Sequence, residues 1–402
     1  MSYYPCLSIS KKDSTLYVEL NAILDCHNAK ETFDYIEKHL DNSVDEIVFN
    51  AEKLKYISAD GLDVILELKK KYQKIIIDNA YVGINDTLAL YGFDRFVDIN
   101  RQYRFVSIDG CKIIGQGSHG TIYKIADDTI IKVYKDHSPI EVIENERQYA
   151  KNAFVNGIPT AIAYDVVETK QGYGVIFEMI NGMTLGQYLS ANPEKLDEYS
   201  VKFANLLYTL HKTNADPNLY DDFEEVIIQR VEALRKYISN EDVETLKKVV
   251  KSIPKGYGMI HGDYHPNNVM IDDEGELILI DMADISKGNG FFDLGGSYLV
   301  MNFLAKIPLL KMLVKKVTYI DARSNLRMWD ILMHTYFNTN DNEVIKKYNK
   351  QYRAFSNIRI ATSLGMNSSR PKIISKLMTL YIKYIVVPNA DKYINLFKDW
   401  II

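Results

Sequence analysis

The chain has 402 residues, of which 47% are hydrophobic, and a formal net charge of −5 at pH 7. This length predicts two or more domains, and the hydrophobic fraction is enough to build their cores, which excludes an intrinsically disordered protein. An odd number of cysteines without metal-like spacing (Cys6, Cys26 and Cys111), no secretory signal and no apolar run long enough to span a bilayer exclude a disulfide-stapled secreted domain and favour the cytoplasm.

Residues 1–104 predict a small sheet with helices packed on it. TLYVEL alternates as a strand does, and AKETFDYIEKHL has the apolar spacing of a helix. EIVFNAEK, KIIIDNA and RFVDI read as further strands, whereas ADGLDVILELKKKYQ and INDTLALYGF read as helices. This alternation of strands and helices predicts an α/β unit.

The order of these elements, and above all FNAEKLKYISADGLDVILELKKKY, resembles a STAS domain of the anti-sigma-factor-antagonist type. The resemblance implies a regulatory domain that can contact a protein partner. In regulatory members, a serine two residues before the loop glycine is phosphorylated at a helix start. The glycine here is Gly61, so the matching position is Ala59, which puts the usual phosphorylation switch in doubt. Of its neighbours, Ser58 stays open as an acceptor, and we expect Asp60 to be an ordinary helix cap.

A glycine-rich stretch, IIGQGSHGTIYKIADDTIIKV, begins at residue 113. Gly115, Gly117 and Gly120 form G-x-G-x-x-G, a pattern that two unrelated nucleotide-binding folds use. A dinucleotide-binding fold needs a helix directly after the glycines, whereas TIYKI and TIIKVY predict two strands of a hairpin. A kinase-type nucleotide loop is therefore favoured, with Gly115, Gly117, Ser118 and Gly120 around the phosphates and Lys132 on the second strand pairing with them.

The segment after this hairpin predicts a helix and then two strands. SPIEVIENERQYAKNAF starts with a proline and acidic residues, which is typical of a helix N-terminus. A kinase needs one glutamate here to orient the lysine. We expect Glu146, with Glu144 as the alternative. The second of the following strands ends at Glu178, Met179 and Ile180, and we expect Glu178 and Ile180 to line the adenine pocket through their backbone groups.

The loop HGDYHPNN lies between two apolar runs, and LILID follows and ends at Asp281. Asp263 and Asn268 sit five residues apart in that loop. In the protein-kinase template, the first Asp accepts the proton of the acceptor hydroxyl, and the Asn and the later Asp hold Mg²⁺. Carboxylate and amide oxygens suit this hard ion. Together the three residues predict phosphoryl transfer.

These motifs, in this order, resemble the protein-kinase-like fold in its aminoglycoside and choline phosphotransferase branch, over about residues 110–300. The resemblance implies ATP and Mg²⁺ as cofactors, Asp263 as the base, Asn268 and Asp281 as metal ligands, and His265 and Asp293 as braces of the loop. His261-Gly262-Asp263 replaces His-Arg-Asp, and only about a dozen residues separate Asp281 from Asp293. Both departures favour a small-molecule acceptor over a protein one.

We therefore expect three parts: a STAS-like domain over residues 1–104, a kinase-like N-lobe over 105–180, and a helical C-lobe over 181–402. From residue 298 onward, 17 Lys plus Arg face 6 Asp plus Glu, a net +11, so the rest of the chain carries −16. This asymmetry indicates either an anionic partner or a basic face docked on the acidic part of the same chain. We expect Leu309, Leu310, Leu313, Ile374, Leu377 and Leu380 to lie on amphipathic helices at the back of the C-lobe, and Trp329, Tyr336 and Trp400 to lie in its core.

Three functions stay open. The first is a phosphotransferase for a small hydroxyl compound that is neutral or anionic, because a polycationic aminoglycoside or choline would prefer an acidic pocket. The acidic residues at 221–224 and Glu241-Asp242 weaken that preference, because they could line the pocket instead. The second is a bacterial protein kinase in a STAS signalling system, and the third is a pseudokinase that binds nucleotide without turnover. The complete set of Lys132, Glu146, Asp263, Asn268 and Asp281 counts against the third. We expect no nucleic-acid partner and no transmembrane segment.

Overall fold

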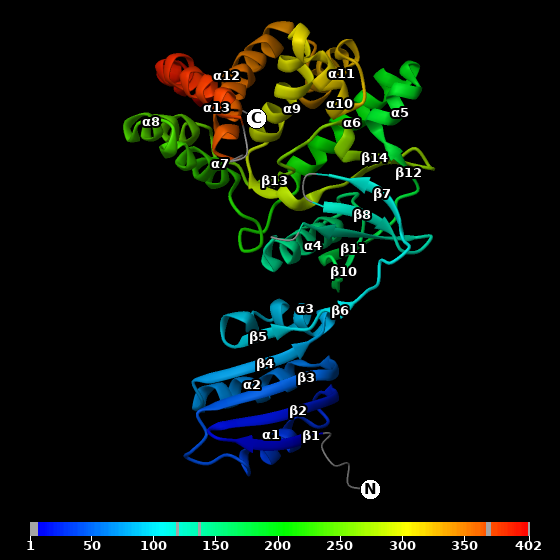
Figure 1. Cartoon of the computed structure of the whole chain (residues 1–402), viewed down its shortest axis with the longest axis vertical. Coiled ribbons are helices and arrows are strands. Elements are labelled where there is room, and N and C mark those ends of the chain that lie inside the picture. The colour runs from blue at the N-terminus through cyan, green and yellow to red at the C-terminus, as the bar shows by residue number, and fades with distance from the viewer. Residues whose placement is uncertain (1–6, 118–119, 136–137, 367–370, 401–402) are drawn as a thin grey trace. The chain divides into compact units, whose positions relative to one another are not determined.

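The computed structural model describes residues 7–117, 120–135, 138–366 and 371–400 (Figure 1). By its internal contacts the chain divides into two compact units. Unit 1 comprises residues 1–125, 131–137 and 165–176, and unit 2 comprises 126–130, 138–164 and 177–402.

The first sheet belongs to unit 1 and has the strand order β1-β2-β3-β4-β5. Strands β1 and β2 are antiparallel, and the other neighbours are parallel. The strands are β1 Leu7–Lys12, β2 Thr15–Leu24, β3 Glu46–Ile57, β4 Lys74–Ala80 and β5 Asp98–Arg101, and the helices among them are α1 Ala29–Glu37, α2 Ala59–Lys71 and α3 Val82–Leu90. The predicted α/β alternation is confirmed. Alternate side chains of β2, such as Leu16, Val18 and Leu20, are buried in the core of this sheet.

Two details of this sheet differ from the prediction. Strand β1 was not predicted, because an edge strand with no fully buried residue lacks the clear alternation of β2. The last strand lies at Asp98–Arg101 and not at 95–99, because a 3₁₀ turn over Phe93–Arg95 precedes it.

The start of α2 is capped by Ser58 and not by Asp60. The side-chain oxygen of Ser58 accepts the N–H of Gly61 at 3.4 Å, and Asp60 lies inside the first turn. Gly61 is required by close approach, because a Cβ there would lie 2.5 Å from the carbonyl oxygen of Leu24. The expectation that Asp60 caps the helix is wrong, since the chain leaves the extended conformation of β3 at Ser58.

We expect Ser58→Ala to lower the free energy of unfolding of this domain by about 0.5–2 kcal/mol, because it removes the helix cap. Asp60→Asn keeps the cap and serves as the matched control, with a change within about 0.5 kcal/mol. Urea unfolding followed by circular dichroism measures both. An equal loss in the two variants would contradict the assignment of the cap.

The second sheet has the strand order β6-β10-β11-β9-β8-β7. Its strands are β6 Arg104–Phe105, β7 Lys112–Gln116, β8 Gly120–Lys124, β9 Thr129–Tyr134, β10 Ala163–Thr169 and β11 Gly172–Glu178, and helix α4 Ile140–Val155 follows β9 in the chain. The glycine-rich stretch is thus followed by strands β8 and β9, which are neighbours in the sheet. The predicted hairpin is confirmed, and the helix that a dinucleotide-binding fold would need is not there.

The remainder of unit 2 is mainly helical, as predicted (Figure 1). Its helices are α5 Leu185–Ala191, α6 Leu196–Lys212, α7 Phe223–Glu232, α8 Asn240–Lys251, α9 Phe291–Tyr298, α10 Lys311–Thr318, α11 Ala322–Tyr336, α12 Asn342–Met366, α13 Lys372–Tyr381 and α14 Ala390–Lys398. Its short strands are β12 Gly182–Thr184, β13 Gly258–Ile260, β14 Val269–Asp272, β15 Leu277–Leu279 and β16 Ser286–Gly288. The turn η1 Phe93–Arg95 belongs to unit 1. The short helical turns of unit 2 are η2 Pro193–Lys195, η3 Ala233–Lys236, η4 Pro266–Asn268, η5 Met282–Asp284, η6 Leu299–Phe303, η7 Leu304–Lys306, η8 Pro308–Leu310, η9 Ile382–Val386 and η10 Val387–Asn389.

An aromatic cluster holds the centre of this helical part. The Phe291 ring lies 5.2 Å from the rings of Phe355 and Phe397 and 5.5 Å from Trp400. Trp329, Tyr336 and Trp400 are buried, as the sequence predicted. Because aromatic side chains bury large areas, this cluster fixes α9 against α12 and α14, and α9 carries Asp293 of the functional site.

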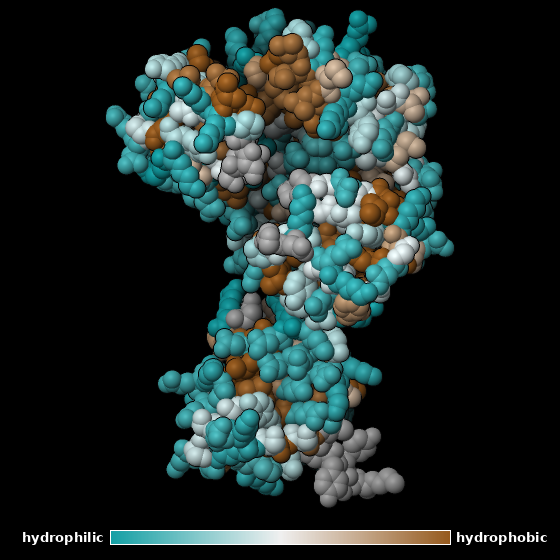
Figure 2. Space-filling model, viewed as in Figure 1, coloured by the Kyte–Doolittle hydropathy of each residue, from teal (hydrophilic) through white to brown (hydrophobic). Residues whose placement is uncertain are grey.

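Four of the six apolar residues expected on amphipathic helices lie on them, Leu313 on α10 and Ile374, Leu377 and Leu380 on α13, whereas Leu309 and Leu310 lie in the turn η8. Most of the six are exposed. Leu309 is 93% exposed and Leu377 is 61% exposed, and Leu313, Ile374 and Leu380 are exposed as well. Helix α13 contains no buried residue. Figure 2 shows brown atoms gathered over the helical part, near where Figure 1 draws α9, α10 and α13. An amphipathic pattern indicates an apolar face and leaves open what covers it.

Among the described residues, no single helix has the length and apolar composition of a membrane span. One bent pair, Phe291–Lys306 and Pro308–Thr318, meets these criteria only when taken together, with an angle of 114° between its halves.

Candidate active site

Asp293 on α9 holds the loop that follows β13. Its Oδ2 accepts the backbone N–H of His261 at 2.7 Å, and its Oδ1 accepts that of Gly262 at 2.7 Å. His211 on α6 lies 3.0 Å from Oδ2 through Nε2, and its Nδ1 lies 2.7 Å from the Tyr336 hydroxyl. Tyr336 therefore donates to Nδ1, and Nε2–H donates to the carboxylate. Gly290 permits this approach, because a Cβ there would lie 2.4 Å from Nδ1 of His211.

The loop presents Asp263 beside His265 and Asn268. His265 Nδ1 accepts the N–H of Asn267 at 3.2 Å, so its Nε2 carries the proton and faces Asp263 Oδ2 at 3.4 Å. Asn268 Nδ2 donates to the backbone oxygen of Asp263 at 2.9 Å and to its Oδ2 at 3.3 Å. Two neighbouring side chains therefore orient the Asp263 carboxylate, which is 54% exposed.

Asp263 is held in its ionised form. Although about half of the side chain is exposed, the surrounding protein would raise the pKa of this carboxyl, but the hydrogen bond from His265, the neighbouring His265 and His261 rings and the charge of Arg359 outweigh that effect and lower it to about 2. A carboxylate that is ionised at neutral pH can accept a hydrogen bond from an alcohol hydroxyl.

The β14–β15 hairpin brings Asp281 next to Asn268. Val269 pairs with Leu279, and Ile280 N–H donates to the Asn268 carbonyl at 3.1 Å. Asp281 follows Ile280 with φ of 61° and ψ of 61°. This left-handed conformation is uncommon for a residue other than glycine and is found often at functional sites.

The oxygen atoms of Asn268 and Asp281 fit a Mg²⁺ ion. Asn268 uses its Nδ2 on Asp263, so Oδ1 is the side-chain atom that it can offer to a cation. Hard cations prefer such amide and carboxylate oxygens, and Mg²⁺ keeps several waters.

The two glutamates proposed as partners of a lysine differ in burial. Glu146 on α4 is 2% exposed, whereas Glu144 is only partly buried. Glu146 fits the role better, because a buried carboxylate needs a partner. Helix α4 also packs against the turn η5, which begins directly after Asp281. Lys132 lies on β9, where its Nζ is 5.2 Å from the centre of the Tyr134 ring.

The glycine-rich loop is closed by a hydrogen bond from the N–H of Gly117 to the carbonyl of Gly120 at 2.9 Å. Gly120 must lack a side chain, because a Cβ there would lie 2.2 Å from the carbonyl oxygen of Val133. Gly115 lies in β7, next to Ile122. Ser118 lies outside the described residues.

The segment after β11 has some of its backbone donors already engaged. Glu178 N–H donates to the Ile162 carbonyl at 2.9 Å, and Met179 N–H donates to the Asp128 carbonyl at 2.8 Å. Neither N–H can donate to an adenine ring without breaking one of these bonds. The N–H of Ile180 is the next donor along the segment.

Sequence reasoning missed two arginines at the catalytic loop. Arg359 on α12 donates through Nη2 to the Gly262 carbonyl at 3.4 Å, and Arg230 on α7 lies 3.7 Å from Asp284, three residues after Asp281. They are separated from the loop by about a hundred and about thirty residues, and no local motif marks either one.

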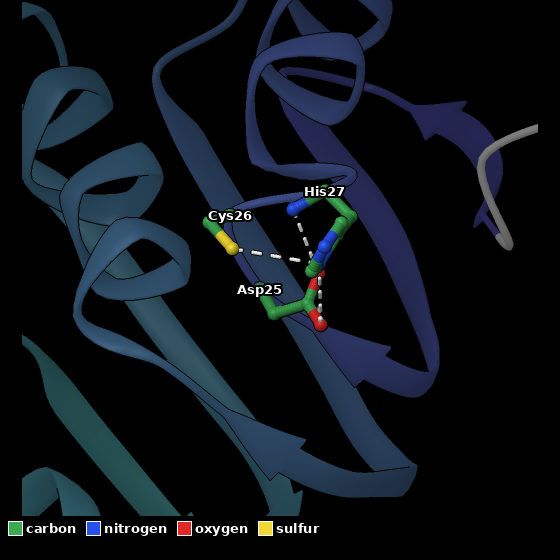
Figure 3. A group of neighbouring side chains, drawn as sticks. All are labelled: Asp25, Cys26 and His27. Carbon is green, nitrogen blue, oxygen red and sulfur yellow. Dashed lines mark hydrogen bonds and ion pairs between the residues drawn. The ribbon is translucent and has the colours of Figure 1, made fainter.

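Asp25, Cys26 and His27 form a separate group of potential metal-binding side chains in the described part of the chain (Figure 3). Cys26 Sγ lies 3.4 Å from His27 Nδ1, which lies 3.4 Å from Asp25 Oδ2. These are consecutive residues in the turn after β2, and Asp25 Oδ1 accepts the His27 N–H at 2.9 Å. The local turn therefore explains why the group is close together.

Comparisons with known proteins place the chain in a family. The model of the phosphotransferase enzyme family matches residues 110–313, just over half of the 402 residues. The chain belongs to the phosphotransferase enzyme family. The site residues from Gly115 to Asp293 all lie inside the matched phosphotransferase region. The model of the STAS domain matches residues 7–104, so a STAS domain precedes the phosphotransferase domain.

Solved phosphotransferase structures resemble the chain at low identity. The ADP-bound aminoglycoside phosphotransferase APH(2'')-Ib is 14% identical, with 71% of this chain and 93% of that chain covered and a TM-score of 0.47. The streptomycin–ATP complex of APH(2'')-IIa is 15% identical, with 71% and 93% covered and a TM-score of 0.43. A comparison with curated protein sequences finds no significant match.

Proposed function

We propose that this phosphotransferase moves the γ-phosphoryl group of ATP, with Mg²⁺, to a hydroxyl of a small molecule. The arrangement that carries the proposal is Asp263 oriented by His265 and Asn268, with Asp281 placed beside Asn268 by the β14–β15 hairpin. This pair of acidic residues and an amide serves phosphoryl transfer in the kinase template. For the nucleotide side we propose Gly115, Gly117, Ser118, Gly120, Lys132, Glu146, Glu178 and Ile180.

In the proposed reaction, the acceptor hydroxyl donates a hydrogen bond to the ionised Asp263 carboxylate. The oxygen–phosphorus bond to the acceptor forms as the bond from the γ-phosphorus to the leaving β-phosphate oxygen breaks, and ADP leaves. The hydroxyl proton passes to Asp263 and then to solvent. His265 and Asn268 keep the carboxylate oxygens aimed, and Asp293 keeps the loop backbone in place.

Asn268 and Asp281 would hold Mg²⁺, which when bound neutralises phosphate charge. Asp281→Ala should weaken binding of Mg²⁺–ATP by about 10-fold or more, because it removes the carboxylate ligand. Calorimetric titration with Mg²⁺–ATP and with metal-free ATP in EDTA measures this effect. The two proteins should differ only in the presence of Mg²⁺, and equal affinities there would exclude the metal role of Asp281.

The short segment after Asp281 favours a small acceptor. Strand β16 begins at Ser286 and pairs with β13, and α9 begins at Phe291. Every residue between Asp281 and Asp293 lies in or next to one of the short elements η5, β16 and α9. This leaves no long activation segment that could recognise a protein substrate.

We also propose that residues 1–104 regulate residues 105–402, which form an N-lobe over 105–180 and a C-lobe over 181–402. The STAS match supports the first boundary, since it ends at residue 104. Ala59 occupies the position of the usual phosphoserine, so regulation by the STAS domain would depend on binding a partner.

The decisive experiment uses radiolabelled ATP. The full-length protein is incubated with ATP labelled at the γ-phosphate, first alone and then with a small-molecule extract of cells that carry the protein. Label in the small-molecule fraction supports the proposed function. Label on the protein itself, or on an added STAS-domain protein, would assign it to the protein kinases, and intact ATP in every mixture would identify a pseudokinase.

A further inference from the structure

Arg359 places a guanidinium behind the catalytic loop, and not all of its N–H donors have acceptors. Its Nη2 makes one long hydrogen bond, 3.4 Å, to the Gly262 carbonyl. Its Nη1 is buried and has no hydrogen-bond partner among the described residues. Within the described part of the chain, no carboxylate lies within ion-pair distance of this side chain. A buried cationic donor without an acceptor is costly, so this atom calls for an explanation, and a bound anion would supply one.

Arg230 brings a second guanidinium to the same place. Helices α7 and α12 pack against each other, and a Cβ on Gly365 of α12 would lie only 3.3 Å from the Arg230 carbonyl. Asp284, which lies next to Arg230, packs against Gly262, since a Cβ on Gly262 would lie only 2.8 Å from Asp284 Cβ, and the carbonyl of Gly262 is the group that Arg359 binds. Burial and the charge of Arg230 lower the pKa of Arg359, whereas Asp263, Asp284 and Asp293 raise it. Arg230 Nη2 is 3.7 Å from Asp284, longer than a hydrogen bond, and 18% of its side chain is exposed.

The acidic groups near these arginines have other partners or face solvent. Asp293 uses both oxygens on the loop backbone and on His211. Asp263 is oriented by His265 and Asn268. The Asp284 side chain is 49% exposed. None of the three forms the two parallel hydrogen bonds for which a guanidinium is shaped, whereas a carboxylate or a phosphate group can form them.

We propose that the acceptor is an anionic hydroxy compound whose carboxylate or phosphate group binds Arg359 and Arg230 while its hydroxyl faces Asp263. This inference rests on the proposed function, because it names the substrate class of the same site. It assigns a binding role to two residues on α7 and α12 that stand outside the kinase motifs.

The test separates possible acceptors by charge before the reaction. A small-molecule extract of the producing cells is divided by ion exchange into anionic, cationic and unretained fractions, and each is incubated with the full-length protein and γ-labelled ATP. We expect label only in products of the anionic fraction. Alkaline phosphatase treatment of that fraction beforehand destroys a phosphate-bearing acceptor and spares a carboxylate. A labelled product from the cationic or unretained fraction overturns the anion site and leaves the proposed function standing, whereas no labelled small molecule in any fraction overturns both.

Variants then test the two arginines with the active fraction. Arg230→Gln should raise the KM for the acceptor about 10- to 100-fold, the usual effect of losing a charged hydrogen bond, with the KM for ATP unchanged. Arg359→Lys keeps the positive charge but loses the planar guanidinium that can form two parallel hydrogen bonds, so it should also raise the KM for the acceptor. Arg327→Gln is the matched control, since Arg327 on α11 is exposed and pairs with Asp197. A rise in the KM for ATP would assign the arginines to the transferred phosphate and would overturn the proposal. An unchanged KM for the acceptor in Arg230→Gln would also overturn it, because Arg359 would then only hold the Gly262 carbonyl in place.

Discussion

Replacing Asp263 by alanine should lower the rate of phosphoryl transfer by about 10²–10⁴-fold, the usual contribution of a positioned general base. The variant should still bind ATP, because Asp263 faces the acceptor side and is not one of the proposed metal ligands. Initial rates with γ-labelled ATP measure the loss, and calorimetry measures nucleotide affinity. Unchanged consumption of ATP in this variant would remove Asp263 from the mechanism.

Two controls sharpen this result. Asp263→Asn keeps the shape and the hydrogen bonds but removes the charge, so it should be nearly as inactive as alanine. Asp273→Asn changes an exposed carboxylate on the β14–β15 turn and should leave the rate within about 2-fold. A slow Asp273→Asn variant would point to a general disturbance of the hairpin.

The low pKa of Asp263 also predicts how the stability and the activity of the protein depend on pH. Its pKa falls from the usual value of 3.8 to about 2 on folding, so the stabilisation that this carboxylate provides is present above 3.8 and is lost as the pH falls through 2. Titration of Asp263 therefore should not limit activity between about pH 5 and pH 9. The measurement is kcat/KM as a function of pH, and a loss of activity with a midpoint between about pH 5 and pH 9 would show that another group limits the rate.

Asp293→Ala is expected to have the largest effect on stability. The Asp293 side chain is fully buried, and its removal leaves three donors without an acceptor: the backbone N–H groups of His261 and Gly262 and the Nε2–H of His211. Breaking a buried charged network of this kind costs about 3–5 kcal/mol. Trp329 and Trp400, the two tryptophans of the chain, are both buried in the helical part, so denaturant unfolding followed by their fluorescence reports on this part alone.

The outer bond of the same network provides a graded control. Tyr336→Phe removes only the hydroxyl that donates to His211 and should cost about 1 kcal/mol. Asp293→Asn should resemble alanine, because its amide nitrogen would face one of the two backbone N–H groups. If Tyr336→Phe destabilised the protein as much as Asp293→Ala, the carboxylate could not be the centre of the network.

The fold was predictable from sequence where the signal is local. Period-two and helical patterns identified β4, α2 and the β8–β9 hairpin, because each element shows its own buried face. The five-residue spacing from Asp263 to Asn268 was informative for the same reason, since a short loop between two strands fixes both side chains. The cap of α2 was predicted two residues too late, at Asp60 and not at Ser58, because the end of β3 and not the acidic residue decides where the helix begins.

The parts that sequence left open depend on contacts between distant segments. Nothing near Arg359 marks it as a neighbour of Gly262, almost a hundred residues earlier, because packing of α12 brings them together. The apolar residues of α10 and α13 show the opposite case. Their helical spacing was read correctly, but burial depends on whether another element covers that face, and among the described residues none covers most of it.

The anchoring of His261 and Gly262 to Asp293 also bears on how such an enzyme can be switched. Two hydrogen bonds of 2.7 Å to a buried carboxylate fix the loop in its working shape before any substrate arrives. The resting protein therefore has no disassembled loop for a covalent signal to repair. A cell that needs to silence it would act on protein abundance, on delivery of the acceptor, on nucleotide entry or through a partner bound to the STAS domain, and a preparation of the purified protein should show its full rate from the first turnover, with no lag.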